Sequence, residues 1–345
     1  MSSDIALFLV QDGLTNGAIY ALMSLALVLV FAVTRIIFVP QGEFLAYGAL
    51  TLASLEAGRV PGTIWLLAAL GTAAFAFDLP ALLRRRAGGA ALRSAAWNLL
   101  LPGTIAALVY ALAGHGTSRL LQVALTCLTV IPLGPLLYRL AYQPIASAPV
   151  LVLLIVSVAL HLALSGVGLF LFGAEGVRTA PFSDASIQVG GLLVTGQSLW
   201  VYACSVALMA LLYAFFERSL YGKALRATAV NRVGARLSGI STIFAGRASF
   251  VLAAAIGVFS GVLIAPITTI YYDTGFLVGL KGFVGAIIGG LTSYPLAAAG
   301  ALLVGLLESF ASFWASAFKE VIVFTLIIPV LLWLSLRTHH DEEEE

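Results

Sequence analysis

Long apolar runs, separated by short polar or charged stretches, recur along almost the whole chain. Many of them are about 20 residues long, which is the length an α-helix needs to cross a ~30 Å hydrocarbon core. The runs 151–172 and 321–336 contain very few polar side chains. Strands of a membrane barrel would alternate apolar and polar residues instead. The pattern therefore predicts an all-α, polytopic membrane protein.

The apolar runs divide into about eleven expected helices, so we predict about 10–11 transmembrane helices, some of them broken. The first run is too long for one simple span and contains Gly13, Asn16 and Gly17, so part of it is expected to bend or to lie in the interface. The expected helices cover residues 5–39, 43–57, 63–83, 96–113, 120–140, 150–172, 198–216, 243–266, 276–291, 296–310 and 321–336.

Composition supports a membrane location, since 61% of the 345 residues are apolar and only 10% are charged. A soluble domain carries about 25% charged residues, which this chain could not supply for a surface in water. No basic patch with interleaved aromatic residues indicates nucleic-acid binding. Cys127 and Cys204 stand alone in apolar runs, which is typical of small buried side chains and not of a zinc site or a disulfide framework.

The lysines and arginines are unevenly distributed between the two sides that alternating spans would create. One side carries thirteen of them and the other side four, which predicts by the positive-inside rule that the first side is cytoplasmic. The first set is Arg35, Arg84, Arg85, Arg86, Arg93, Arg139, Arg218, Lys223, Arg226, Arg232, Arg236, Arg247 and Arg337, and the second is Arg59, Arg119, Arg178 and Lys319. The C-terminus is then cytoplasmic, and the loop 173–197 lies outside, where residues 189–194 could form a small turn or hairpin.

The whole chain, 1–345, is expected to be a single transmembrane domain. It contains no G-x-x-x-x-G-K-[ST] motif, so we expect no phosphate-binding loop and no bound cofactor. Any ATP that drives this protein would be bound by partner subunits.

Glycine-interrupted segments occur early in each half of the chain. Residues 38–44 combine Pro40 and Gly42 with Glu43, and residues 273–283 combine several glycines with Lys281. Paired interrupted helices in two repeats are typical of a transport pathway and indicate an internal inverted repeat. The predicted pathway residues are Gln41, Gly42, Glu43, Phe44, Gly279, Lys281 and Gly282.

A simpler interpretation applies to the same residues. The 34 glycines, which include Gly285, Gly289, Gly300 and Gly305, would let helices pack closely in lipid and do nothing more. Glu43, Lys281 and Glu308 would then form buried pairs that fix the register of helices, or would extend toward the interface.

His161 and Ser165 lie four residues apart, and therefore on one face of an expected helix. An intramembrane serine protease needs a serine nucleophile and a histidine base, but no oxyanion-hole signature accompanies this pair. A polar packing contact is the better interpretation, and we predict that the chain is not an enzyme.

The basic stretch 217–241 is long for a loop between two spans. Its apolar residues recur near helical spacing between Gly222, Gly234 and Gly239, which predicts short amphipathic helices. Such helices could dock into a groove of another protein or lie on the membrane surface, and a plain surface loop is the alternative.

Several motifs, in order, resemble the permease family of branched-chain amino-acid ABC importers. The basic stretch contributes Gly222-Lys-Ala-Leu-Arg-Ala-Thr-Ala229 and Ala235-Arg-Leu-Ser-Gly-Ile240 to this resemblance. The other motifs are Asn16-Gly-Ala-Ile-Tyr-Ala-Leu22, Gly42-Glu-Phe44, Leu140-Ala-Tyr-Gln-Pro-Ile145, Gly279-Leu-Lys-Gly-Phe283, Gly289-Gly-Leu-Thr-Ser-Tyr-Pro295 and Lys319-Glu-Val-Ile-Val-Phe324. The resemblance covers roughly 12–57 and 136–336.

The resemblance implies an inner-membrane permease subunit of an ATP-driven importer in bacteria. Its partners would be two ATPase subunits, a second permease subunit and a periplasmic substrate-binding protein. The stretch 217–241 would be the coupling loop, and its ATPase-coupling residues would be Gly222, Lys223, Leu225, Arg226, Ala229, Arg236, Leu237 and Gly239.

The sequence departs from the family pattern at three places. Gln41 replaces the usual histidine before Gly-Glu-Phe, and Gln143 replaces the usual arginine of the Tyr-Arg-Pro turn. Residues 63–117 resemble an insertion of about two extra spans. The solute therefore stays open between branched-chain amino acids and urea, amides or aromatic acids, and an ion-coupled secondary transporter or channel is the alternative function.

Overall fold

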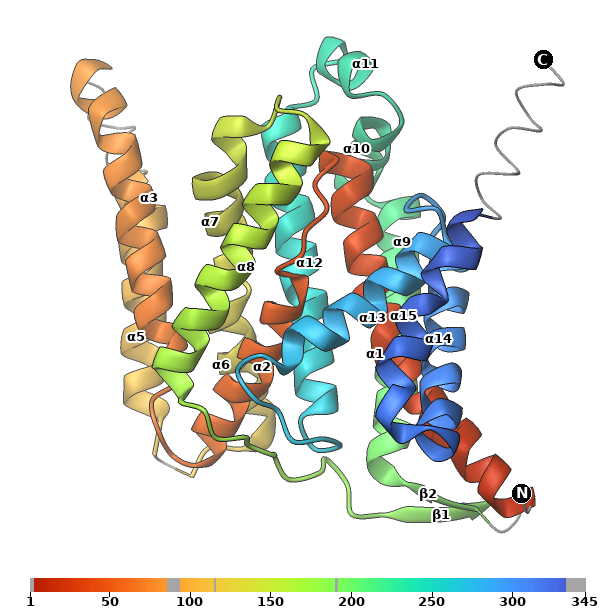
Figure 1. The fold of residues 1–345 in the computed structure, drawn as a ribbon. Helices are drawn as coiled ribbons and strands as arrows, with labels where there is room; N and C mark the ends of the chain where they lie inside the picture. The colour runs from red at the N-terminus through yellow and green to blue at the C-terminus, as the bar shows by residue number, and fades with distance from the viewer. Residues whose placement is uncertain (1–2, 86–93, 115, 190–191, 333–345) are drawn as a thin grey trace, which may run out of the picture.

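The computed structural model describes residues 3–85, 94–114, 116–189 and 192–332. Helices run between two ends of the molecule and make up most of this part (Figure 1). Within it, seven helices are long and apolar enough to cross a membrane, which confirms the all-α polytopic prediction. These spans are Asp4–Thr34, Thr63–Pro80, Arg119–Ile145, Val150–Phe172, Gly196–Arg218, Thr242–Ile264 and Tyr294–Trp314.

Each expected segment corresponds to one helix or to two or three consecutive helices, and residues 333–336 of the last segment lie outside the described residues. The elements are α1 (Ser3–Thr34), α2 (Gln41–Glu56), α3 (Thr63–Arg85), η1 (Ala96–Leu100), α5 (Leu101–Leu112), α6 (Arg119–Val130), α7 (Leu133–Leu137), η2 (Tyr138–Tyr142), η3 (Gln143–Ile145), α8 (Val150–Phe172), α9 (Gly196–Arg218), α10 (Leu220–Val230), α11 (Arg232–Leu237), α12 (Thr242–Ile264), α13 (Thr274–Ile288), α14 (Tyr294–Trp314), η4 (Ser316–Phe318) and α15 (Lys319–Thr325). β1 (Ser186–Val189) and β2 (Leu192–Thr195) pair antiparallel in the loop 173–197, where the sequence predicts a small turn or hairpin.

Several segments differ in length from a simple span. The first run is one continuous helix only as far as Thr34, because Arg35 has a left-handed backbone (φ 61°) and ends α1. Pro40 then precedes α2, which has 16 residues and is too short to cross alone. The segment 120–140 is broken after Val130, where Pro132 cannot donate a backbone hydrogen bond.

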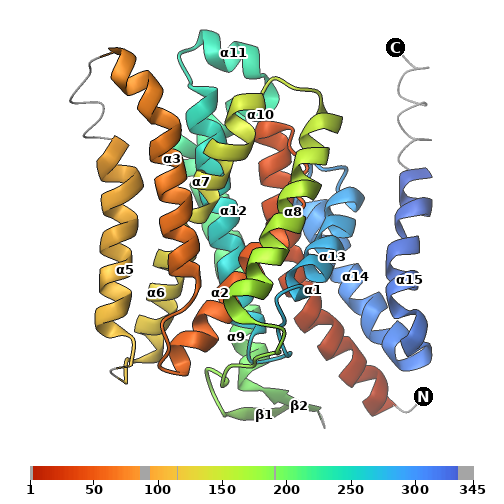
Figure 2. The same ribbon diagram turned by 60° about the vertical axis from the view of Figure 1, so that its left-hand side comes forward.

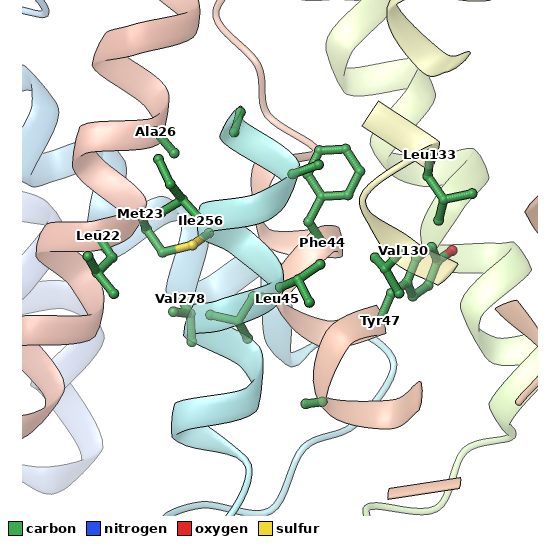
Figure 3. Packing of buried hydrophobic residues seen from close by; sticks show 14 of the residues in the cluster. Leu22, Met23, Ala26, Phe44, Leu45, Tyr47, Val130, Leu133, Ile256 and Val278 are labelled. Carbon is green, nitrogen blue, oxygen red and sulfur yellow. The ribbon is translucent and has the colours of Figure 1, made fainter. Parts of the chain in front are cut away.

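Helix α1 lies at the centre of the bundle. In its apolar window 89% of the residues are buried, against 17% for α9, which lies at the periphery. In Figure 3, Met23 of α1 faces Ile256 of α12, and Phe44 and Leu45 of α2 lie on the other side of α12. The core therefore connects the N-terminal half of the chain directly with the C-terminal half.

Small residues allow these helices to approach closely, as expected for packing in lipid. A Cβ added at Gly305 of α14 would lie 2.4 Å from the carbonyl oxygen of Gly13 and 2.5 Å from the Cα of Gly17, both on α1. A Cβ at Gly285 of α13 would lie 2.7 Å from the Cβ of Ala301. Glycine at these positions thus has a packing role whatever else the helices do.

The two ends of the bundle differ in charge. Helices α10 and α11 stand at one end, and the β1–β2 hairpin lies at the other end near the N-terminus (Figures 1 and 2). Arg59, Arg119 and Arg178 belong to the hairpin end, where Arg119 pairs with Glu56 at 3.0 Å and Arg178 donates to the carbonyl of Pro266 at 2.8 Å. Arg86, Arg93 and Arg337 lie outside the described residues.

Helices α3 and α5 pack on one flank of this bundle. Arg139 of η2 contacts Asp78 of α3 and donates to the side-chain oxygen of Asn98 of η1 at 2.9 Å. Ser94 and Asn98 extend the same polar cluster, with 3.0 Å between the hydroxyl and the amide nitrogen. The role of 63–117 as an insertion stays a prediction.

Candidate functional site

The two glycine-interrupted segments meet where α2 crosses α13. A Cβ added at Gly42 would lie 1.9 Å from the carbonyl oxygen of Gly275, and a Cβ at Gly275 would lie 2.1 Å from that of Gly42. Gly279, one turn further along α13, faces Gly42 at 3.2 Å by the same measure. Backbone therefore touches backbone at this point, which we call the α2–α13 crossing, and the contact leaves no room for side chains.

Glu43 is fully buried beside the crossing and binds a histidine. Its Oε1 lies 2.7 Å from Nδ1 of His161 on α8, and the imidazole stacks on Phe276 of α13 with 4.2 Å between ring centroids. The second oxygen of Glu43 has no hydrogen-bond partner among the described residues. One carboxylate thus connects three helices that come from distant parts of the sequence.

Gln41 and Phe44 complete the first turn of α2. The amide nitrogen of Gln41 donates to the carbonyl of Ala253 on α12 at 2.9 Å, while its amide oxygen has no partner among the described residues. Phe44 packs on Phe38, with 5.7 Å between ring centroids. The predicted pathway residues Gln41, Gly42, Glu43, Phe44 and Gly279 therefore form one cluster.

Lys281 and Gly282 lie apart from this cluster, on the side of α13 that faces α1 and α14. The ammonium of Lys281 donates to Glu308 at 2.6 Å and to Glu320 at 3.1 Å. The hydroxyl of Tyr20 donates to the other oxygen of Glu308 at 2.6 Å. Gly282 packs against Met23 of α1. Lys281 and Glu308 thus form the buried pair that the simpler interpretation of these charges expects.

Some members of these two clusters were not evident in the sequence. The sequence pattern pairs His161 only with Ser165, and it assigns no separate role to Tyr20 or Glu320. A histidine in an otherwise apolar helix needs a polar partner, and so does a glutamate in an apolar turn. The requirement of both residues for a polar partner is the sequence feature from which the Glu43–His161 pair could have been predicted. The pair agrees with the interpretation of His161 as a polar packing contact.

The basic stretch forms two short helices, as its spacing predicts. Ser219 accepts the backbone N–H of Gly222 and caps α10, and Asn231 accepts that of Gly234 and caps α11. Gly239 has φ +83° and ends the second helix, a conformation that favours glycine. The cap residues therefore set the boundaries of both helices.

The predicted coupling residues do not share one environment. Leu225 is fully buried against Leu29 and Val33 of α1, and Gly222 is buried against the backbone of Phe215. Ala229 is half-buried. Arg226 pairs with Glu217 at 2.8 Å near the surface.

The remaining predicted residues Lys223, Arg236, Leu237 and Gly239 are exposed. Apolar side chains on α10 and α11 are exposed with them: Leu237 is 85% exposed, Leu220 83% and Val230 81%. Leu220 and Val230 were not among the predicted coupling residues. Outward-facing apolar side chains among cations, at an end of the bundle, form a surface suited to another protein.

The sequence of the chain is similar to a family of known transport proteins. A family described as "Branched-chain amino acid transport system / permease component" matches residues 9–331. The high-affinity branched-chain amino acid transport system permease protein LivH of Escherichia coli (strain K12) is 26% identical over 341 residues, which cover 96% of this chain and 95% of LivH.

The permease protein BraD of the corresponding system in Pseudomonas aeruginosa is 28% identical over 240 residues, covering 66% of this chain and 78% of BraD. No solved structure gives a significant match. The family match therefore includes both the α2–α13 crossing and the α10–α11 segment.

Proposed function

The chain belongs to the family of permease components of branched-chain amino acid transport systems, and from that membership we propose roles for the two sites described above. It is a membrane-spanning permease subunit of an ABC importer and not an enzyme. Permeases of such systems work with ATPases and a binding protein. We propose that this subunit helps to import branched-chain or other hydrophobic amino acids.

The exposed apolar side chains of α10 and α11 are the observation that carries the coupling role. Leu220, Val230 and Leu237 are each more than four-fifths exposed, while Leu225 anchors α10 on α1. A rigid helix that is anchored on one face and exposes apolar groups on the other can transmit the movement of a bound partner. We infer that an ATPase subunit docks here.

The pathway role rests on the α2–α13 crossing. In transporters, substrate sites near the middle of the bilayer are built from discontinuous helices whose ends face the substrate. The first turn of α2 begins inside the protein after Pro40 and carries Gln41 and Glu43, each with one buried oxygen that lacks a donor in the described part of the chain. Such acceptors suit the ammonium group of an amino acid, so we propose that the solute passes this turn.

Orientation and stoichiometry are further proposals. The concentration of cations at the end that carries α10 and α11 favours a cytoplasmic location for that end and for the C-terminus. Two ATPase subunits and a second permease subunit in the bacterial inner membrane would complete the importer. The N-terminus, which lies at the hairpin end, would then be periplasmic.

Reconstitution tests the function directly. The chain would be assembled in proteoliposomes with its second permease, its ATPases and its binding protein, and uptake of labelled leucine would be measured. We expect uptake that requires both ATP and the binding protein, with competition by valine and isoleucine but not by urea. Uptake that persists without ATP and stops when the proton gradient collapses would instead establish the ion-coupled alternative.

A further inference from the structure

An apolar groove of about 670 Å³ opens between α1, α9, α10 and α14 at the basic end of the bundle. Its walls include Leu29, Val33, Leu212, Phe216, Tyr294 and Ala298. Two cations, Arg35 and Arg226, line the same groove. Nothing in the coupling or pathway roles requires a groove of this kind.

Arg35 is the unusual member of this lining. It ends α1 with φ 61°, a conformation in which helices ordinarily place glycine or asparagine. Its side chain is exposed, and its guanidinium lies 5.8 Å from the ring centroid of Phe31. Arg226 is neutralised by Glu217 at 2.8 Å, whereas Arg35 has no ion-pair partner among the residues that the structure describes. The groove therefore ends beside an uncompensated positive charge.

We propose that this groove binds an anionic phospholipid, with an acyl chain between α9 and α14 and the phosphate at Arg35. The groove borders α9, the helix with the smallest buried share among the spans, so lipid can reach it from the side. Basic pockets between membrane helices on the cytoplasmic side are suited to anionic headgroups. Tyr213, which is 71% exposed, also lines the groove and is a side chain typical of the interface.

The position of the groove gives such a lipid a mechanical consequence. Leu225, Ala229 and Val230 of α10 form one of its walls, and α14 forms another. A bound acyl chain would thus fill the space between the proposed coupling helix and the core helix that packs on α1. This site would make the position of α10 depend on the lipid, independently of which solute is transported.

Native mass spectrometry of the purified transporter complex, titrated with phosphatidylglycerol or with phosphatidylcholine, tests the proposal. Arg35→Asn keeps a residue that tolerates the left-handed backbone but removes the charge. Arg59→Asn, at an exposed arginine of the hairpin end that does not line the groove, is the surface control. Ala298→Phe fills the groove, and Ala299→Phe changes the exposed neighbour outside it. We expect one tightly bound phosphatidylglycerol, about five-fold weaker binding in Arg35→Asn, and loss of binding in Ala298→Phe.

The two controls should bind phosphatidylglycerol like the unmodified complex, and thermal unfolding would show that every variant is folded. Equal retention in all four variants would overturn the proposal. So would equal affinity for both lipids together with no effect of Arg35→Asn, because the headgroup would then not be recognised. Cross-linking from a cysteine at Ala298 to another subunit, with no lipid bound, would show that protein and not lipid occupies the groove.

Discussion

The carboxylate of Glu43 and the imidazole of His161 lie 2.7 Å apart, although 118 positions separate them in the sequence. Phe276 covers the ring of His161 from α13. The pair therefore holds the first turn of α2 between α8 and α13. A change in either partner should affect both the stability of the bundle and the proposed pathway.

His161→Ala should destabilise the protein by roughly 1–3 kcal/mol, because it leaves the buried carboxyl group of Glu43 without its hydrogen-bond partner. His161→Gln can still donate a hydrogen bond and should recover part of that loss. Thermal unfolding in detergent would give the order unmodified, His161→Gln, His161→Ala. If His161→Ala and His161→Gln unfolded at the same temperature as the unmodified chain, the hydrogen bond would contribute nothing to stability.

Gly42→Ala should prevent the close approach of α2 and α13. The added methyl group would lie 1.9 Å from the carbonyl oxygen of Gly275, and backbone on both sides cannot yield without separating the helices. Overpacking of this kind costs about 1–3 kcal/mol or more. Gly166→Ala is the matched control, since a Cβ at Gly166 of α8 would meet no atom of the described residues within 4 Å.

Size-exclusion profiles and thermal unfolding would compare the two variants. We expect lower yield and a lower unfolding temperature for Gly42→Ala, with Gly166→Ala unchanged or slightly stabilised because alanine favours a helix. Equal behaviour of the two variants would mean that α2 and α13 are further apart than the structure has them.

The contact between α2 and α13 was only partly predictable. Prolines and glycines indicated where the helices are interrupted, since these residues act on the local backbone. That the two interruptions touch depends on how α12 and α1 pack between distant segments, and no local pattern encodes it. For the same reason Gly279 and Lys281, only two residues apart on α13, face different neighbours.

Lys281 and Glu308 should be energetically coupled. Lys281→Met leaves the buried carboxylate of Glu308 without its cation, and Glu308→Gln leaves Lys281 with Glu320 as its remaining ion-pair partner. Removal of one partner of a buried pair costs about 3–5 kcal/mol. Lys281→Met should be the more harmful change, because it leaves Glu308 and Glu320 without the cation that both contact. The double variant should lose less stability than the sum of the two single losses.

A double-mutant cycle of unfolding free energies would measure this coupling. Tyr20→Phe is an informative companion, because it removes only the hydroxyl that donates to Glu308 at 2.6 Å and should cost about 1.5–3 kcal/mol. Strict additivity of Lys281→Met and Glu308→Gln would contradict the ion pair.

The basic segment illustrates a second limit of sequence analysis. The apolar spacing between Gly222, Gly234 and Gly239 predicts short amphipathic helices, and the structure has two, capped by Ser219 and Asn231. Periodicity alone does not say which apolar face turns toward the bundle. Leu225 faces α1 and Leu237 faces away, a distinction that depends on where α10 meets α1.

Substitutions in the coupling segment should therefore affect either association with a partner or the folding of the permease, depending on whether the side chain is exposed or buried. Val230→Glu and Leu237→Glu change side chains that are more than four-fifths exposed, so they should leave folding unchanged. If an ATPase docks on these side chains, burying a new carboxylate in the contact should weaken association about ten-fold or more. Leu225→Ala should instead destabilise the permease by about 2–5 kcal/mol, because it opens a cavity against α1.

Co-purification with the ATPase subunits and thermal unfolding of the permease would resolve these effects. The combined variant Arg226→Glu and Leu237→Glu is the strongest test, since it reverses one charge and removes one apolar contact on the same segment. It should abolish ATPase association while the permease stays folded. Undiminished association in this variant would mean that α10 and α11 are not the docking surface. Movement of the ATPase subunits would then have to reach the α2–α13 crossing through other residues.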